Sequence, residues 1–262
     1  MRILFAILLL AQSYPLRAEI QDVLKSAEID RMLARAADSL AVHEKPNFAV
    51  VLRVAQGKPN PPQTQSNVDE VWFVRRGKAG LTLGTSRYDA ADGDIVHVPR
   101  GTAFQVDPGS GRFEYVAVRV FPATGRPAPG GFIPTGKMPD VLKKSVIDAT
   151  FANSEKNQPL HAGSNFTVNY VVYKGRSGPW EAHRGCVDIY FLHDGTATAQ
   201  LGGVISNPKE ETPGEIRGDG VSGARASQIG PGDIVLIPRN TAHHMTPASG
   251  KLGYMLVKVW AD

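Results

Sequence analysis

Cysteine is almost absent from this chain, and several chemical signatures are missing with it. Cys186 is the single cysteine among 262 residues, so no disulfide can form within the chain. The formal net charge of +4 is small and spread along the whole length, which leaves no basic footprint for nucleic acid. The sequence holds no glycine-rich phosphate loop before a helix and no serine nucleophile elbow. We therefore expect a fold stabilised by its apolar core, with no nucleic-acid partner.

Long apolar runs are missing as well, except at the N-terminus. Residues 1–18 have the pattern of a secretory signal peptide: Arg2 supplies the positive start, an apolar run extends from Ile3 to Ala11, and Ala18 offers a cleavage site. The run is too short to span a bilayer. We expect a periplasmic or secreted protein with no membrane attachment after cleavage. The alternative is an unusually apolar N-terminus of a cytosolic protein.

The chain contains two similar halves. The sequence NFAV at residues 47–50 recurs as NFTV at 165–168, which is 118 residues later. The sequence GDIV at residues 93–96 recurs at 232–235, now 139 residues later, so the second half carries 21 extra residues. A repeat of about 120 residues has the size of a domain. We predict a first domain over 19–122, a linker over 123–138 and a second domain over 139–262.

Each half begins with helical spacing of apolar residues, over 19–40 and 139–152. Short runs rich in β-branched and aromatic residues follow, separated by glycine and proline, which favours an all-β closed barrel or double-sheet jelly roll. The expected strands are 48–55, 71–75, 94–98 and 115–121 in the first half, and 166–173, 188–192, 233–237 and 252–259 in the second.

The extra residues of the second half lie within 203–229. This stretch has few apolar residues, so we expect no strand with a buried face there. One interpretation is a surface loop, because loops lengthen at little cost in free energy. The other is a lid over the mouth of the second barrel.

Two glycine-aspartate motifs carry a family resemblance. GDIVHVPRG at residues 93–101 and GDIVLIPRNTAH at 232–243 both resemble the second motif of the cupin superfamily, and residues 69–77 resemble the end of its first motif. The chain thus resembles a two-domain bicupin. The resemblance implies two double-stranded β-helix (jelly-roll) barrels, each preceded by an amphipathic helix. It does not imply one activity, because cupins include enzymes, sugar-binding regulators and storage proteins.

Cupins typically bind a divalent metal ion through three histidines and a carboxylate, the first two histidines standing at i and i+2 on one strand face. The equivalent positions of the first half are Gln63, Gln65, Glu70 and Phe104. Neutral amides are poor ligands and phenylalanine is none, so we expect no metal ion in the first barrel. We expect Glu70 to be a strand-edge charge or a hydrogen-bond acceptor.

The same positions of the second half can all coordinate a metal ion. They are Glu181, His183, Asp188 and His243. Two imidazoles and two carboxylates suit iron, manganese or zinc. Glu181 departs from the family histidine, and Asp188 is one methylene shorter than the usual glutamate. The alternative is a polar cavity in which His183 and His243 bond to backbone or water.

Two further residues lie close to this motif in sequence. We expect Cys186 to be a buried, inert thiol rather than a ligand or a redox group, because nothing near it in the sequence marks a lowered pKa. His244 directly follows His243 on a predicted strand, so its side chain points the other way unless the register slips by one residue.

The residues leave three hypotheses about function open. The first is a metal-dependent enzyme, an oxygenase or isomerase acting on a small molecule in the second barrel. The second is a non-catalytic protein that binds a small ligand. The third is a structural duplication in which the first barrel stabilises the second. The resemblance also makes a homodimer an expectation.

Overall fold

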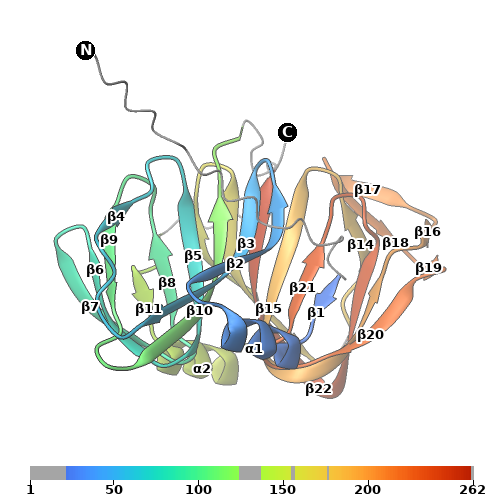
Figure 1. The fold of residues 1–262 in the computed structure, drawn as a ribbon. Coiled ribbons are helices and arrows are strands. Elements are labelled where there is room, and N and C mark those ends of the chain that lie inside the picture. Colours follow the sequence, from blue (N-terminus) through green and yellow to red (C-terminus); the bar gives the residue numbers. More distant parts are fainter. Residues whose placement is uncertain (1–21, 124–136, 155–156, 176, 261–262) are drawn as a thin grey trace, which may run out of the picture.

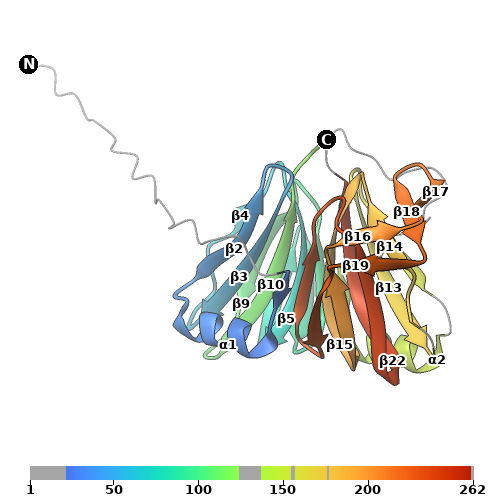
Figure 2. The same cartoon turned by 90° about the vertical axis from the view of Figure 1, so that its right-hand side faces the viewer.

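The computed structural model describes residues 22–123, 137–154, 157–175 and 177–260. The expected signal peptide and most of the expected linker lie outside these ranges. Strands dominate the described chain, and they curl into two barrels that stand side by side (Figures 1 and 2). The expectation of an all-β jelly-roll fold is confirmed. No helix in the described part of the chain has the length and apolarity needed to cross a membrane.

The first barrel is built from a six-stranded sheet in the order β11-β8-β5-β10-β3-β2 and a four-stranded sheet in the order β4-β9-β6-β7. Helix α1 (Ser26–Arg35) precedes it. Its strands are β2 (Ser39–Lys45), β3 (Phe48–Gln56), β4 (Gln63–Thr64), β5 (Asp69–Arg76), β6 (Lys78–Leu83), β7 (Ser86–Ala91), β8 (Ile95–Val98), β9 (Ala103–Asp107), β10 (Arg112–Val120) and β11 (Val141–Leu142).

The second barrel is built on a ten-stranded sheet whose long strands β15 and β22 pair with each other. Helix α2 (Lys144–Asn153) precedes it. Its strands are β1 (Val23–Leu24), β12 (Gln158–Ala162), β13 (Phe166–Lys174), β14 (Trp180–His183), β15 (Cys186–Leu201), β17 (Lys209–Thr212), β18 (Glu215–Gly218), β20 (Arg225–Ile229), β21 (Ile234–Ile237) and β22 (His243–Trp260), and β16 (Val204–Ser206) and β19 (Gly220–Ser222) form a separate pair.

The extra residues of the second half form strands rather than a loop. They contain β16 to β20, and β17 and β18 form a hairpin that pairs with β14. Most of these positions are exposed or half-buried, but β20 pairs with β15 and buries Ile229. The expectation that this stretch has no strand with a buried face is therefore wrong at β20. Pairing with the extended strand β15 supplies the apolar surface that the local sequence lacks.

Both helices are shorter at their start than the apolar spacing predicted. The residues just before each helix form a short strand instead, and each of these strands joins the other barrel (Figure 1). Strand β1 precedes α1 and pairs with β21, with Val23 opposite Val235. Strand β11 precedes α2 and pairs with β8, with Val141 opposite Val96. The two barrels thus exchange strands reciprocally.

The aspartate of each glycine-aspartate motif holds the exchanged segment in place. Asp233 accepts the backbone N–H of Ser26 at 2.7 Å and forms an ion pair with Lys25. Asp94 accepts the backbone N–H of Lys144 at 2.8 Å and forms an ion pair with the preceding lysine. In both cases a buried carboxylate lies at the start of a helix, where the helix dipole favours negative charge. We call these two contacts the aspartate latches.

Gly77 and Gly195, matched by the sequence repeat, each lie close against the backbone of a neighbouring strand. Their φ angles are +91° and +74°. A Cβ atom would lie 2.0 Å from the backbone oxygen of Arg112 at Gly77, and 2.1 Å from that of Lys251 at Gly195. Only glycine meets both requirements, positive φ and close backbone approach.

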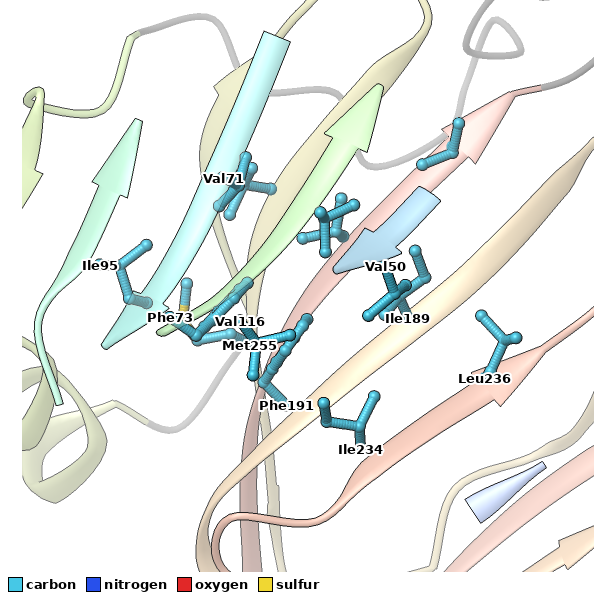
Figure 3. Close-up of a cluster of buried hydrophobic side chains, with 14 of the residues drawn as sticks. Val50, Val71, Phe73, Ile95, Val116, Ile189, Phe191, Ile234, Leu236 and Met255 are labelled. Carbon is cyan, nitrogen blue, oxygen red and sulfur yellow. The ribbon is translucent and has the colours of Figure 1, made fainter. Parts of the chain in front are cut away.

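The barrels pack against each other through one apolar core. Phe73 on β5 and Phe191 on β15 stack with their ring centroids 3.4 Å apart (Figure 3). Helix residues on the buried faces of α1 and α2, such as Ile29 and Ile147, join the same cluster. The described barrels therefore share a continuous hydrophobic core rather than touching at a polar surface.

The interiors of the two barrels differ. In the first barrel, aromatic rings fill the space: Trp72 lies 4.5 Å from Tyr115 and 5.3 Å from Phe104, measured between ring centroids. In the second barrel a cavity of about 490 Å³ opens between β13, β14, β15, β18 and β22. The second barrel therefore has room for a small molecule, as a ligand site requires.

Candidate metal centre in the second barrel

Three of the four predicted ligands meet in the second barrel. Glu181 and His183 are two residues apart on β14, so the strand presents them on one face. The first residue of β22, His243, pairs directly with Glu181. One donor atom from each of these three side chains can be chosen so that all lie within 4.8 Å of one another.

One buried ring nitrogen of each histidine in this group lacks a hydrogen bond. The Nε2 atom of His243 lies 3.4 Å from a carboxylate oxygen of Glu181, and the Nδ1 atom of His183 lies 2.8 Å from a carboxylate oxygen of Glu215. Neither contact has hydrogen-bond geometry, and both nitrogens are buried. Buried polar atoms are normally satisfied, so these atoms call for a further partner. The donor set of two imidazoles and one carboxylate fits a divalent metal ion.

The fourth predicted ligand, Asp188, lies beside this group. Its Oδ2 atom is 3.2 Å from Nε2 of His183, and its Oδ1 atom is 3.7 Å from Nζ of Lys258. Among the described residues, the group with Glu181 and His243 does not include Asp188. Burial opposes the charge of Asp188, but Lys258 and His183 hold its pKa well below the ordinary value. Its role as a metal ligand stays a prediction.

A half-buried lysine completes the cluster, and it was not among the residues predicted from the sequence. Lys258 pairs with Asp188 across β22 and β15, and its Nζ atom lies 3.3 Å from Nε2 of His183. Burial disfavours the ammonium, yet Asp188 and the neighbouring acids raise the pKa of Lys258 above its ordinary value. The lysine therefore stays charged. The signal that could have found it is Arg119, which stands 139 residues earlier in the matching strand of the first half.

The extra segment of the second half also contributes a side chain to the cluster. Glu215 on β18 stands opposite His183 on β14, and its other carboxylate oxygen lies 3.7 Å from Nζ of Lys258. The first half has no equivalent residue, so no comparison between the halves could have indicated it. The hairpin of β17 and β18 forms one wall of the cavity, which favours the lid interpretation over a plain surface loop.

The acidic and basic side chains of the cluster stabilise each other's charged forms. Burial lowers the tendency of His183 to carry a proton, but Asp188 and Glu215 raise its pKa to about 9. Burial acts against the charge of Glu181, but His243 lowers its pKa to about 2. Near neutral pH the carboxylates are thus ionised and His183 carries a proton, which a metal ion has to displace when it binds.

The cavity next to the cluster has an aromatic wall and a polar wall. Tyr190 and Tyr254 stack with ring centroids 4.2 Å apart. Asn169 has a buried side-chain oxygen without a hydrogen bond. The full lining, in chain order, is Asn157, Asn169, Val171, Tyr173, Glu181, His183, Asp188, Tyr190, Glu211, Thr212, Glu215, Arg217, Tyr254, Leu256, Lys258 and Trp260.

The matching positions of the first barrel surround an arginine. Nε of Arg119 donates to Glu70 at 2.9 Å, and a terminal nitrogen donates to Gln65 at 3.1 Å. The second oxygen of Glu70 accepts the indole N–H of Trp72 at 2.6 Å. Glu70 is thus a buried hydrogen-bond acceptor, one of the two roles expected for it. The remaining positions, Gln63 and Phe104, pair with each other across β4 and β9.

Cys186 and His244 lie at the edge of the cluster. Cys186 is buried, and burial raises the pKa of its thiol, in line with the expected inert side chain. Its sulfur can still be grouped with His183 and Glu215 within 4.8 Å. His244 stacks on Trp180 at 4.5 Å between ring centroids, so its ring is engaged outside the group of Glu181, His183 and His243.

Comparison with solved structures identifies the fold. A cupin 2 conserved barrel domain protein from Leptotrichia buccalis superposes with a TM-score of 0.64 at 11% identity, covering 93% of this chain and 98% of that one. A salicylate 1,2-dioxygenase from Pseudaminobacter salicylatoxidans has a TM-score of 0.66 at 9% identity, covering 90% and 83%. Its gentisate adduct has a TM-score of 0.64. No protein-family model matches the chain, and no curated protein matches it in sequence. At these identities the likeness shows a cupin-type fold and nothing finer.

Proposed function

We propose that the second barrel binds one divalent metal ion and, beside it, a small organic molecule. The observation that carries the proposal is the group of Glu181, His183 and His243, whose donor atoms lie within 4.8 Å of one another. The buried ring nitrogens without hydrogen bonds support it, because a metal ion would satisfy them.

Glu181, His183 and His243 would hold the ion. Two imidazoles with one carboxylate suit iron, manganese or zinc, and leave coordination positions open. A bound ion would act as a Lewis acid toward the small molecule. A redox-active ion could instead transfer electrons to the co-substrate with which the small molecule reacts. A dioxygenase among the structural neighbours makes oxygenase chemistry the first class to test, with isomerisation the second.

The chain's own residues would shape the site around the ion. The stacked rings of Tyr190 and Tyr254 offer an apolar surface for the body of the small molecule. Asn169 offers an unpaired buried oxygen that can accept a hydrogen bond from a hydroxyl or amine. The β17–β18 hairpin closes one side of the cavity and limits the entry of water.

The test is the metal content of the purified protein, measured by elemental mass spectrometry. We expect near-stoichiometric iron, manganese or zinc, lost in His183→Ala and in His243→Ala. Gln65→Ala and Phe104→Ala are the matched controls, because they alter the same positions of the first barrel and should keep the metal. Wild-type protein without metal, even after reconstitution with all three ions, would refute the proposal.

A second candidate function is binding of a small ligand without any metal ion. The observation in its favour is Lys258, whose ammonium already lies among His183, Asp188 and Glu215. A ligand that binds only the native state must raise the melting temperature. A thermal-shift screen of small metabolites, run with and without chelator, separates the two candidates. Stabilisation that survives chelation supports the metal-free function.

We also propose that the two barrels arose by internal duplication and that the chain is exported. The duplication is supported by a carboxylate paired with a cationic residue at the same register of both barrels: Glu70 stands opposite Arg119, and Asp188 stands opposite Lys258.

Export is supported by the composition of residues 1–18 alone. N-terminal sequencing of protein from the cell envelope would test it. A homodimer stays a prediction that sedimentation equilibrium tests.

A further inference from the structure

We propose that each barrel carries an internal cation at the metal position: Arg119 replaces the metal ion in the first barrel, and Lys258 keeps Asp188 out of its coordination sphere in the second. The second part deepens the proposed function and assigns a positioning role to Lys258. The first part accounts for Glu70, a buried carboxylate that the first barrel retains among residues unable to bind a metal ion.

The evidence in the second barrel is the placement of Lys258. It projects from β22 directly opposite Asp188 on β15, and its ammonium lies 3.7 Å from Oδ1 of that carboxylate. The Asp188 side chain is 2% exposed and that of Lys258 is 14% exposed, so a buried carboxylate faces a half-buried ammonium. A buried carboxylate needs one compensating cation, and the chain supplies it covalently.

The evidence in the first barrel is the same pair at the same register. Arg119 on β10 stands opposite Glu70 on β5 and donates to it at 2.9 Å. Its guanidinium also donates to Gln65, the residue that corresponds to His183. The side chains are 22% and 2% exposed. Here the guanidinium bonds to two of the positions that hold a metal ion in a typical cupin barrel.

The two cations differ in strength as competitors of a metal ion. Arginine is planar, always charged and able to donate several hydrogen bonds at once, so it occupies the metal position of the first barrel and excludes a metal ion from it. Lysine is a point charge on a flexible stem, and it contacts His183 as well as Asp188. The short side chain of Asp188 keeps its carboxylate near the strand from which Lys258 projects. The ammonium therefore neutralises Asp188 and leaves Glu181 with the two histidines for the ion.

The consequence is a centre with three protein ligands rather than four. With Asp188 neutralised, the positions not filled by protein stay open to the small molecule and to solvent. Removing the ammonium would free Asp188 to become a fourth ligand, which would tighten metal binding and close one of these positions.

The experiment uses the full-length chain with Lys258→Met, and Lys258→Gln as a second variant in case the first does not fold. Co²⁺ is the probe, because its visible absorption reports the number of ligands and titration gives the dissociation constant. We expect Co²⁺ to bind about tenfold more tightly than in wild type, which is the scale on which residues outside the ligand set change metal affinity. The absorption spectrum should change with it.

Three further variants make the result specific. Lys258→Arg keeps a cation and should not gain affinity. Lys258→Met combined with Asp188→Asn should return to the wild-type dissociation constant, because both members of a neutral pair are gone. Arg119→Met should leave Co²⁺ binding unchanged, since the first barrel still lacks ligands at Gln63, Gln65 and Phe104.

The outcomes separate this inference from the proposed function. No gain in either neutral variant of Lys258, or a gain that survives Asp188→Asn, overturns the inference even if the wild type binds metal. If the wild type binds no metal but Lys258→Met binds Co²⁺ through Asp188, the inference stands and the proposed function falls. An unchanged Co²⁺ spectrum despite tighter binding would also count against it, because no ligand would have been added.

Discussion

The two barrels share their frame and differ in what fills them. At the centre of the first barrel, Trp72 packs against Phe104 and Tyr115. In the second barrel, Tyr190 and His243 stand at the positions of Trp72 and Phe104, their ring centroids are 6.4 Å apart, and Tyr190 borders a cavity of about 490 Å³. The comparison shows that a few inward-facing residues decide whether the same barrel becomes a packed core or a site.

The contacts that join the two barrels, in contrast, are the same in both halves. Each aspartate latch joins a glycine-aspartate turn to the helix start of the other half, with the same backbone and lysine contacts. Residues that fill the barrel interiors differ, whereas the latch residues that join the barrels match. The joining contacts are thus the same in both halves, while the candidate metal ligands lie in one.

The largest expected effect comes from emptying the first barrel. Trp72→Ala removes a fully buried indole from an aromatic core, so we expect the free energy of unfolding to fall by about 3–5 kcal/mol. Tyr190→Ala is the matched change, and its loss should be smaller, because the Tyr190 ring already borders a cavity. Chemical denaturation measures both. An equal or larger loss for Tyr190→Ala would break the contrast between packed and hollow barrels.

A smaller effect is expected from the latches, where the barrels should behave alike. Asp233→Ala leaves the N–H groups of Ser26 and Gly230 without their acceptor. Asp94→Ala does the same to the N–H groups of Lys144 and of the last residue of β7. We expect each variant to lose about 2 kcal/mol of stability. Metal content should not change in either. Losses that differ by more than about twofold would show that the two joints are not equivalent.

The smallest effect concerns a histidine that only the first barrel carries. His97 lies 4.3 Å from His161 across the barrel interface, and the matching residue of the second half is Leu236. Burial, and after it His161, lowers the pKa of His97 from 6.5 to about 4, against the opposing effect of Asp69 and Asp140. In the unfolded chain the imidazole takes up a proton below pH 6.5, which the folded protein resists.

Stability should therefore fall as the pH falls from 6.5 toward 4, by about 1 kcal/mol between pH 7 and pH 5.5 for this group. His97→Leu installs the residue of the second barrel and should flatten that part of the profile. Denaturation midpoints at the two pH values check it, with Lys78→Gln, a change at an exposed strand residue, as a control for general charge effects. An unchanged slope in His97→Leu would assign the pH dependence elsewhere.

Much of the frame could be predicted from sequence, because inward and outward residues alternate along each strand. The expected strand 48–55 falls within β3, and 252–259 falls within β22. The exchanged strands could not be predicted, because two residues such as Val23 and Leu24 have no period, and their partners lie more than 200 positions away. Local spacing assigned these residues to a helix, and tertiary pairing overrode it.

The residues of the candidate site could be predicted where the first half has a matching position. Glu181, His183 and His243 came from matching the halves, and the structure brings them together. Lys258 was missed although the repeat matches it to Arg119, because its partner Asp188 becomes evident only from the strand register. Glu215 was missed because it belongs to a segment that only the second half contains. Contacts that depend on strand register or on an inserted hairpin cannot be predicted from the local sequence pattern.

The reciprocal exchange of β1 and β11 has a consequence for how the chain can be divided. A cut between residues 124 and 136 would leave each fragment with one strand that completes the other fragment's barrel. Neither fragment would hold a full sheet by itself, since β8 and β21 would each expose an unpaired edge. Mixed together, the fragments carry complementary strands at opposite ends. The fold is therefore suited to split-protein reassembly, in which recovery of the native β-sheet signal would report that two separate chains have found each other.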